Sequence, residues 1–206
     1  MDLRNQNVRV STAIILCGGQ ARRLGGVEKP LQAMAGQPLI ERVIEQIQPQ
    51  VPSLLISANR ALDDYRRLAA QVVDDGEYAY CGPLAGIAAG LATSAAGLVL
   101  CVPGDAPWLP PDLLARLSTV RDARHVDLAY VDDGNGPQPL CCLLDTALLP
   151  DLRNYLDAGG RTPRHWLARH TTAAANFDDW PRWAWSTNTA AEWLAAERHL
   201  GTETPA

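Results

Sequence analysis

Short apolar runs alternate with helical runs through the first two thirds of this chain, and that alternation restricts the fold more than any other feature. The apolar runs are typical of strands buried on both faces, which lack the polar alternation of half-exposed strands. The pattern predicts strands at 12–16, 54–57, 71–73 and 98–102, and helices at 38–47, 62–69, 83–94 and 112–119. Because such alternation produces a mostly parallel sheet with helices on both faces, we expect an α/β fold with the strongly apolar 98–102 strand near the centre.

The last third predicts an antiparallel addition to that sheet. Two further strands, 128–131 and 140–144, flank the turn sequence Asp132-Asp-Gly-Asn-Gly136, which is typical of a hairpin. Helices are expected at about 146–157 and 163–169, and Thr189 with Glu192 forms a capping box for a last helix to about residue 199. There is no repeat, linker or low-complexity segment, so residues 1–206 are expected to form a single domain with frayed ends at 1–9 and 201–206.

A glycine-rich loop with three cations follows the first predicted strand. Residues 16–30 contain two Gly-Gly pairs together with Arg22, Arg23 and Lys29. Glycine N–H groups and cationic side chains together favour a phosphate ligand. The loop matches neither Gly-x-x-x-x-Gly-Lys-Ser/Thr nor Gly-x-Gly-x-x-Gly, so two widespread nucleotide motifs are excluded. A purely structural turn remains the alternative.

The charge distribution favours a small anionic ligand over a nucleic acid. Net charge is −5, yet residues 1–30 hold five Arg and Lys against one Asp and one Glu. An acidic protein that gathers its cations beside a glycine loop is unlike a nucleic-acid-binding protein, which carries a broad basic surface. We therefore expect no nucleic-acid partner.

Carboxylates follow two other predicted strands. Asp74 and Asp75 end the third strand, and Asp105 follows the fourth between Pro103 and Pro107. In open α/β sheets, ligands bind at the carboxyl ends of strands, and Mg²⁺ typically takes one or two carboxylates plus substrate phosphates. Asp105 is thus the candidate magnesium ligand. Its alternative role is to cap the next helix, although Asp112 is better placed to cap that helix.

Composition predicts a soluble cytoplasmic protein. Five cysteines without a Cys-x-x-Cys pair indicate free thiols in a reducing compartment. The polar start lacks an apolar signal segment, and no apolar run approaches the ~20 residues that span a bilayer. We expect no membrane partner.

Other residue groups carry weaker functional signals. The four histidines share no metal-binding spacing, which favours surface or capping roles. A Trp180, Trp183 and Trp185 cluster favours a hydrophobic patch over stacking on a flat ligand. Arg161 and Arg164 are equally consistent with phosphate binding and with a solvated helix start.

Several motifs together resemble the molybdenum cofactor guanylyltransferase family. They are Leu16-Cys-Gly-Gly-x-x-x-Arg-x-Gly-Gly-x-x-Lys29, Gly82-Pro-Leu-Ala-Gly86 and Gly104-Asp-x-Pro107, with further matches at Ser57-Ala-Asn-Arg60, Ala158-Gly-Gly-Arg161 and Asn188-Thr189. The resemblance covers most of residues 12–195. It implies a Rossmann-like three-layer nucleotidyltransferase fold, with a mostly parallel sheet and one antiparallel strand.

The resemblance also implies an activity, ligands and site residues. The family transfers GMP from GTP to the terminal phosphate of molybdopterin, releasing pyrophosphate, with Mg²⁺ as cofactor. GTP and molybdenum-molybdopterin are the implied small-molecule partners, and molybdoenzymes or cofactor-insertion proteins are the implied protein partners. If the roles of the family's residues apply at the matching positions, the catalytic residues would be Arg22, Arg23, Lys29 and Asp105, and Asp105 would be the metal ligand. The nucleotide contacts would be Leu16, Cys17, Gly18, Gly19, Lys29, Asn59, Asp75 and Asp105.

Some positions depart from the family pattern and keep alternatives open. Cys17 stands where alanine is usual, a small change expected to have little effect, and Gly104 replaces a common cysteine. Glu28 and Pro30 replace a common aspartate and glycine, and Ser186 replaces the first asparagine of an Asn-x-Asn. The alternatives are a cytidylyltransferase or sugar-phosphate nucleotidyltransferase, and a non-catalytic module that carries the cofactor to molybdoenzymes.

Overall fold

A seven-stranded sheet forms the centre of the protein in the computed structural model, which describes residues 10–18, 28–69, 71–181, 184, 185, 187 and 189–202. The strand order is β5-β4-β1-β6-β8-β7-β9, so β6 is the central strand, as predicted. The strands are β1 (Val10–Leu16), β4 (Leu54–Ser57), β5 (Val72–Val73), β6 (Leu98–Pro103), β7 (Leu128–Asp132), β8 (Pro137–Asp145) and β9 (Thr172–Asn176).

Six of these strands run in one direction and β8 opposes them. β1 pairs in parallel with both β4 and β6, β4 with β5, and β7 with β9. β8 pairs antiparallel with β6 and with β7, so the predicted hairpin supplies the one antiparallel strand of the sheet. The parallel strands therefore all end at the same edge.

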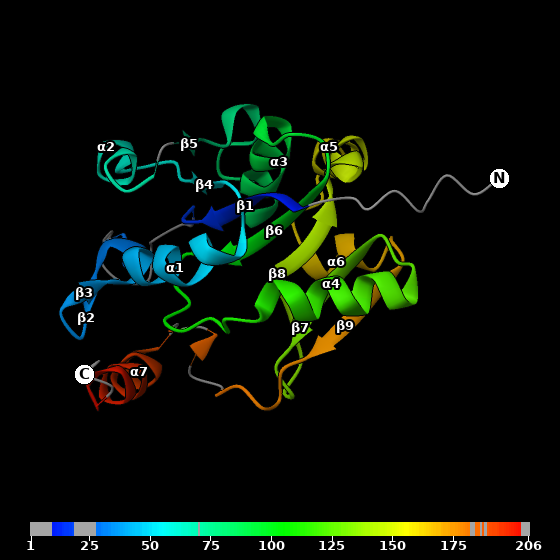
Figure 1. The fold of residues 1–206 in the computed structure, drawn as a ribbon. Coiled ribbons are helices and arrows are strands. Elements are labelled where there is room, and N and C mark those ends of the chain that lie inside the picture. The colour runs from blue at the N-terminus through cyan, green and yellow to red at the C-terminus, as the bar shows by residue number, and fades with distance from the viewer. Residues whose placement is uncertain are drawn as a thin grey trace.

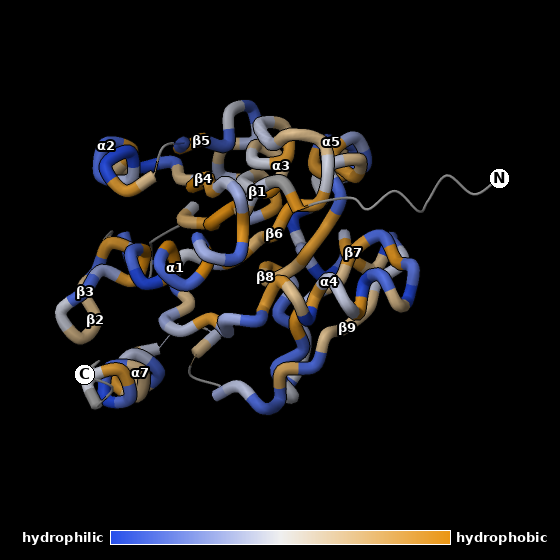
Figure 2. Tube along the Cα trace, in the orientation of Figure 1, coloured by the Kyte–Doolittle hydropathy of each residue, from blue (hydrophilic) through white to orange (hydrophobic). Residues whose placement is uncertain are grey.

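Helices cover both faces of the sheet, which gives the predicted three layers (Figure 1). Against one face pack α1 (Leu39–Ile47), α2 (Leu62–Arg66) and α4 (Leu113–Arg124). Against the other pack α3 (Pro83–Thr93), α5 (Leu149–Asp157) and α6 (Pro163–Leu167). Figure 2 shows the apolar strands between these helices, whose outer sides are hydrophilic. Two hydrophobic cores result, one on each side of the sheet.

Helix α1 shows how the sequence pattern produces this packing. Leu39, Ile40, Val43 and Ile47 are fully buried, and their spacing places them on one face of the helix. Pro38 precedes the first turn, where a missing N–H leaves no helical hydrogen bond unmade. Both the start of this helix and the face that it buries therefore follow from the sequence pattern.

A short hairpin and the last helix form a small third cluster. β2 (Ala33–Met34) pairs with β3 (Gln37–Pro38), and Met34 packs with Leu39 and with Ala196 of α7 (Ala190–Thr202). The capping box is confirmed: Thr189 N donates to Glu192 Oε2 at 2.8 Å, and Glu192 N donates to Thr189 Oγ1 at 3.1 Å. Figure 1 shows α7 lying near this hairpin. The sequence pattern had not indicated the hairpin.

Other elements differ from the prediction. Strand β9 was missed, because its sequence Thr-Ala-Ala-Ala-Asn has little strand character and is ordered by pairing with β7. Helix α4 continues to Arg124, five residues beyond its predicted end at 119. Asp112 is the N-cap residue of α4, as its position predicted, although its side chain makes no capping hydrogen bond.

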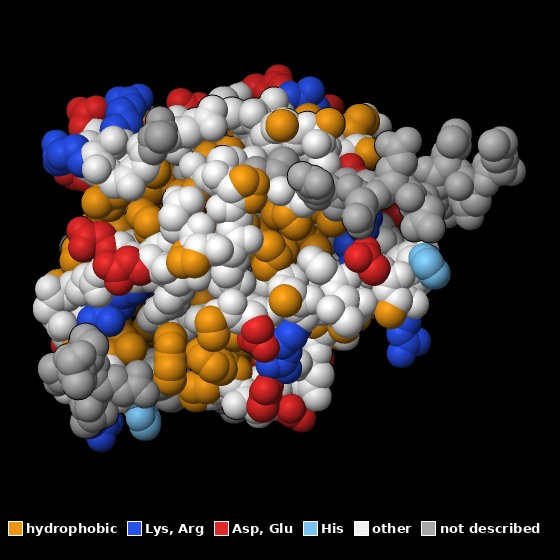
Figure 3. All heavy atoms as spheres, in the orientation of Figure 1, with side chains coloured by type: hydrophobic (Ala, Val, Ile, Leu, Met, Phe, Trp, Pro, Cys, Tyr) orange, Lys and Arg blue, Asp and Glu red, His pale blue; other side chains and the backbone are white. Residues whose placement is uncertain are grey.

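Two further features concern the length of the described helices and the distribution of charge on the surface. None of the helices in the described part of the chain has the length and apolar character needed to cross a bilayer. On the face shown in Figure 3, the coloured cationic side chains lie in small groups beside acidic ones rather than in a broad basic patch.

Candidate active site

The carboxyl ends of four neighbouring strands bring most of the predicted residues together. Cys17 and Gly18 follow β1, Asn59 follows β4, Asp75 follows β5, and Asp105 follows β6. Backbone hydrogen bonds tie these ends to one another: Cys17 N donates to Ser57 O at 2.8 Å and Gly104 N to Leu16 O at 2.9 Å. The sheet itself therefore fixes the relative positions of these loops.

Lys29 and Asp105 form an ion pair at this edge. Lys29 Nζ lies 2.7 Å from Asp105 Oδ2, with 15% and 27% of the two side chains exposed. Lys29 opens a single helical turn, Lys29–Leu31, which leads into the β2–β3 hairpin. Asp105 Oδ1 has no hydrogen-bond partner among the described residues, so one carboxylate oxygen remains for a ligand. The pair places a cation and an anion side by side where a phosphate and its metal would both need a partner.

Gly104 and Cys17 pack against each other beside this pair. A Cβ atom at Gly104 would lie 2.5 Å from Cys17 Sγ and 3.2 Å from Leu16 O. The Cys17 thiol thus occupies the space that a side chain at position 104 would need. Burial raises the pKa of this thiol, so it is a neutral packing group and not a nucleophile. Two of the positions that depart from the family pattern, Cys17 and Gly104, are therefore neighbours in the structure, which the sequence alone did not show.

Asn59 and Asp75 are joined by two reciprocal hydrogen bonds. Asn59 Nδ2 donates to Asp75 Oδ2 at 2.6 Å, and Asp75 N donates to Asn59 Oδ1 at 3.0 Å. Asp75 is buried and its Oδ1 has no partner among the described residues. Burial raises the pKa of Asp75, an effect that the Asn59 amide and the nearby Ser57 hydroxyl oppose and the Asp74 charge reinforces. A buried carboxylate oxygen without a donor is a strong candidate for contacting a ligand N–H.

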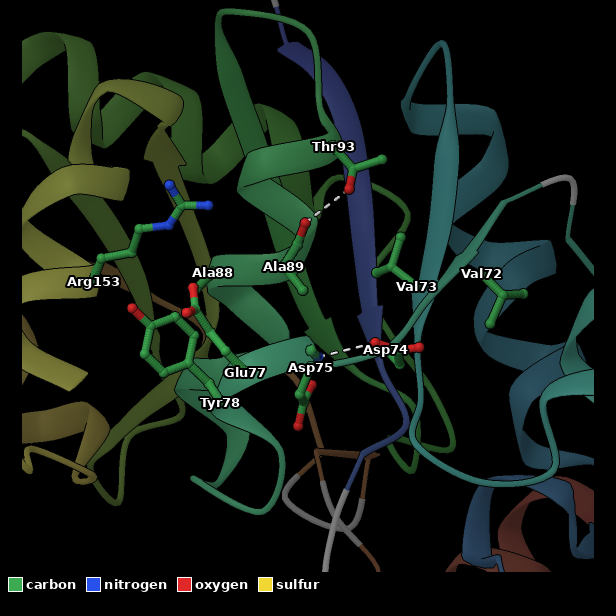
Figure 4. Close-up of a pocket in the computed structure, with 11 residues that line it drawn as sticks. Val72, Val73, Asp74, Asp75, Glu77, Tyr78, Ala88, Ala89, Thr93 and Arg153 are labelled. Atoms are coloured by element: carbon green, nitrogen blue, oxygen red, sulfur yellow. Dashed lines mark hydrogen bonds between the residues drawn. The ribbon is translucent and has the colours of Figure 1, made fainter. Parts of the chain in front are cut away.

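Asp75 lies between two hollows in the surface. One is lined by Leu16, Gly18, Ser57, Asp75, Gly82, Pro83 and Gly86, and so contains the start of α3. Gly82 has φ +85°, a conformation that favours glycine, and it turns the chain into that helix. The other is a cavity of about 400 Å³ between β5, α3 and α5 (Figure 4). Arg153 reaches towards that cavity from α5, while Asp74 accepts a hydrogen bond from Gly76 N.

A second ion pair joins the loops that follow β1 and β4. Arg60 Nε lies 2.7 Å from Glu28 Oε1, and Glu28 directly precedes Lys29. Arg60 in turn directly follows Asn59, so the pair links the loops after β1 and β4. Glu28 was noted in the sequence only as a replacement for aspartate, and its partner could not be read from the spacing.

The remaining candidate residues differ in where the structure places them. Gly19, Arg22, Arg23 and Trp183 lie outside the described residues. Arg161 donates through Nη1 to Leu156 O and Gly160 O, so its guanidinium binds backbone oxygens at the C-terminal end of α5. The rings of Trp180 and Trp108 contact each other at a tilt of 56° with centroids 4.7 Å apart, which supports the hydrophobic-patch interpretation for Trp180. Trp185 packs edge-on against Phe177 in one core. It also borders a pocket of about 150 Å³, called here the Trp185 pocket, which is lined by Asp133, Asn135, Gly136, Pro137, Gln138, Arg164, Trp185 and Glu192.

The fold and this site define a nucleotidyltransferase of the three-layer α/β type, and comparisons with known proteins agree. Residues 13–174 match the model of the MobA-like NTP transferase domain. The chain is 43% identical over 169 residues to the molybdenum cofactor guanylyltransferase of Shewanella amazonensis, covering 82% of this chain and 86% of that one. It is 42% identical over 177 residues to the protein of that name from Burkholderia ambifaria, with 82% and 86% covered.

A solved structure shares the fold. The molybdopterin-guanine dinucleotide biosynthesis protein A of Archaeoglobus fulgidus superposes with a TM-score of 0.75 at 21% identity, covering 93% of this chain and 99% of that one. The chain belongs to the MobA-like NTP transferase family. The family resemblance inferred from the motifs is confirmed.

Proposed function

We propose that this protein transfers GMP from GTP to the terminal phosphate of molybdopterin, with release of pyrophosphate. The observation that carries the proposal is the Lys29–Asp105 ion pair at the carboxyl edge of the sheet, next to the Asn59–Asp75 pair. The names of the relatives at 41–44% identity support guanine as the base and molybdopterin as the acceptor.

On the nucleotide side, defined here as Leu16–Gly18, Asn59 and Asp75, the chain would bind the nucleoside. A Cβ atom at Gly18 would lie 3.4 Å from Asn59 Nδ2, so this stretch of backbone lies beside the Asn59 amide. Asp75 Oδ1, buried and without a partner among the described residues, would accept from the N1–H and amino group of guanine. Asn59 holds the carboxylate in that orientation through its bond to Oδ2.

Asp105 fits the magnesium ion that such a reaction uses. The described residues contain no cluster of three or more His, Cys, Asp and Glu that could hold a metal, which excludes a complete protein cage among them. Mg²⁺ commonly takes one or two carboxylates and completes its shell with substrate phosphates and water, so one carboxylate with an available oxygen suffices. When bound, the ion would offset the charge of the phosphates. Asp105 would hold it.

The chemical step needs positioning more than a protein nucleophile. A phosphate oxygen of molybdopterin attacks the α-phosphorus of GTP, the α–β bridging bond breaks, and pyrophosphate leaves with the electron pair. Lys29, fixed by Asp105, would stabilise the charge that develops, and Arg22 and Arg23 of the same loop would add charge near the pyrophosphate. The rigid strand ends hold the two substrates in line.

The product defines the wider setting that we propose. A guanine dinucleotide cofactor has to reach the enzymes that use it, so molybdoenzymes or their cofactor-insertion proteins are the expected partners. Five free cysteines suit the reducing environment of the cytoplasm.

The test is to incubate the protein with molybdopterin, Mg²⁺ and each nucleoside triphosphate in turn while pyrophosphate release is measured. We expect pyrophosphate release with GTP and with none of the other nucleoside triphosphates. GTP at 100 times its Kd should also add about 2.7 kcal/mol to the unfolding free energy, a rise in Tm of roughly 5–10 °C for a chain of this size. Equal release with CTP would favour the cytidylyltransferase alternative. A GTP-dependent Tm rise without pyrophosphate release would favour a carrier.

A further inference from the structure

Arg116 joins helix α4 to the chain segment that follows β9. Its guanidinium forms a fork with Asp179, in which Nη1 donates to Oδ2 at 3.0 Å and Nη2 donates to Oδ1 at 2.9 Å. Nη2 also donates to the backbone oxygen of Asn176. The Asp112 carboxylate lies 3.9 Å from Nη1, beyond hydrogen-bond distance. A forked arginine–carboxylate pair fixes orientation as well as distance, so Arg116 holds the start of this segment in one position.

The same guanidinium covers an aromatic side chain of the core. The Arg116 Cζ atom lies 3.8 Å from the centre of the Phe177 ring. Phe177 is fully buried, and only 27% of the Arg116 side chain is exposed. Exposed ion pairs contribute little by themselves, but a forked pair that is backed by a buried ring keeps its geometry. One arginine therefore fixes both the backbone and a core side chain of this segment.

Further along, the segment binds the loop that carries Asp105. The described residues of the 176–187 segment lie beside that loop (Figure 1). Trp180 Nε1 donates to Trp108 O at 3.0 Å, and Trp108 N donates to Ala184 O at 3.3 Å. Thr187 Oγ1 donates to the backbone oxygen of Asp105 at 3.3 Å. The last of these bonds reaches the main chain of the proposed metal ligand itself.

The far end of the same loop has a different anchor. Gln46 Oε1 accepts from Leu109 N at 2.5 Å, and Gln50 Oε1 accepts from Leu114 N at 3.0 Å. Gln46 belongs to α1 and Gln50 follows it closely, so these bonds fix against α1 the part of the loop that leads into α4. The 176–187 segment holds the other part, next to Asp105.

We propose that Arg116 is a positioning residue for Asp105 and acts through the 176–187 segment. By clamping the start of this segment, Arg116 keeps the Thr187 hydroxyl on the Asp105 backbone, which fixes the direction in which the Asp105 carboxylate leaves the loop. That carboxylate has to meet both Lys29 and the metal ion, and a small displacement weakens both contacts. The inference rests on the proposed function for the role of Asp105. It gives Arg116 a part in metal binding and transfer, and none in holding guanine.

The test compares Arg116→Gln and Arg116→Lys with Arg169→Gln, a matched variant on the other face of the sheet. Arg169 also combines an ion pair with an aromatic contact: its Nη2 lies 3.2 Å from Asp151 Oδ1, and its Cζ lies 5.6 Å from the centre of the Tyr155 ring. Mn²⁺ is the metal probe, and its Kd is titrated in the presence of a GTP analogue that cannot be cleaved. The kcat for pyrophosphate release, the Kd of the analogue without metal and the Tm are measured beside it.

Arg116→Gln removes the charge and the fork while the side chain stays long. We expect the Kd for Mn²⁺ to rise about tenfold and kcat to fall about tenfold, because a displaced carboxylate misplaces the reacting groups. The Kd of the GTP analogue without metal should stay within twofold, since the strand ends position the nucleotide side. Arg116→Lys keeps the charge without the fork and should fall between the two. Arg169→Gln should leave both Kd values and kcat within twofold, whatever its Tm.

Thr187→Val tests the route by which Arg116 acts. It removes the hydroxyl that donates to Asp105 O and keeps a branched side chain of similar size. Alone, it should raise the Kd for Mn²⁺ roughly threefold, the effect of one lost hydrogen bond. Added to Arg116→Gln, it should raise that Kd by less than twofold more, because the hydroxyl is already displaced.

Three results would overturn the inference. They are an unchanged Kd for Mn²⁺ in Arg116→Gln, an equal change in Arg169→Gln, and fully additive effects of Arg116→Gln and Thr187→Val. Asp179→Asn takes the place of Arg116→Gln if that variant does not fold. If the wild-type protein binds Mn²⁺ and the GTP analogue but transfers no GMP, the proposed function fails, and the titration still decides the role of Arg116. Wild-type protein that binds no Mn²⁺ would overturn the metal assignment and this inference together.

Discussion

The nucleotide side and the Trp185 pocket lie at one edge of one sheet, yet different parts of the chain hold them in place. On the nucleotide side, each residue directly follows a parallel strand, and backbone hydrogen bonds such as Cys17 N to Ser57 O set the spacing. The Trp185 pocket is assembled from a hairpin turn, two helices and a connecting segment, and side-chain bonds such as Gln138 to Asp133 orient it. The comparison shows that the sheet itself sets the spacing of residues on the nucleotide side, whereas contacts between distant segments form the Trp185 pocket.

Asp105 stands between the two regions, and its loss should have the largest effect. We expect Asp105→Ala to lower GMP transfer by at least about 10²–10³-fold, because it removes both the proposed metal ligand and the partner of Lys29. Pyrophosphate release and Tm are the measurements. Asp112→Asn is the matched control, since that exposed carboxylate makes no capping bond. Substantial transfer by folded Asp105→Ala protein would contradict the metal assignment.

Gly104 and Cys17 test whether backbone packing positions Asp105. In Gly104→Ala the new Cβ would lie 2.5 Å from Cys17 Sγ, which we expect to lower stability by about 1–3 kcal/mol and to slow transfer by displacing Asp105. Adding Cys17→Ala should restore most of both, because it removes the sulfur that the Cβ meets. Chemical denaturation and initial rates on the two single variants and the double variant measure this coupling. Additive effects would show that the two positions act independently.

Asp75 should show a smaller and opposite effect on stability. Burial raises the pKa of its carboxyl, so the folded protein retains a proton there to a higher pH than the unfolded chain, and stability falls as pH rises through that range. Asp75→Asn should therefore raise Tm at pH 7 while weakening GTP binding, and the Tm advantage should shrink towards acid pH. Thermal melts from pH 4 to 8, with and without GTP, measure both. An Asp75→Asn protein with a lower Tm at pH 7 would contradict the cost assigned to the buried charge.

Most of the nucleotide side could be predicted from the sequence, because its residues sit in short motifs directly after recognisable strands. The alternating pattern gave β1, β4 and β6, and their ends carry Gly18, Asn59 and Asp105. The contact between Cys17 and Gly104 was not predicted: the two residues are far apart in sequence, and each was judged as a separate replacement.

The Trp185 pocket could not be predicted for a related reason. Trp185 lies 47 residues after Gln138, and only tertiary packing brings the two to one hollow. Strand β9, which leads towards this region, is an alanine-rich segment that becomes a strand by pairing with β7. Local sequence signals identify motifs, whereas a site built by long-range contacts has to be read from the structure.

The most direct test of this division of the sheet edge is a crystal structure with Mg²⁺ and a GTP analogue that cannot be cleaved between its α- and β-phosphates. We predict guanine against Asp75 Oδ1, the α-phosphate beside Lys29 and Asp105, and no part of the nucleotide in the Trp185 pocket. Guanine bound between Trp185 and Gln138 would contradict the division and reverse the two halves of the site.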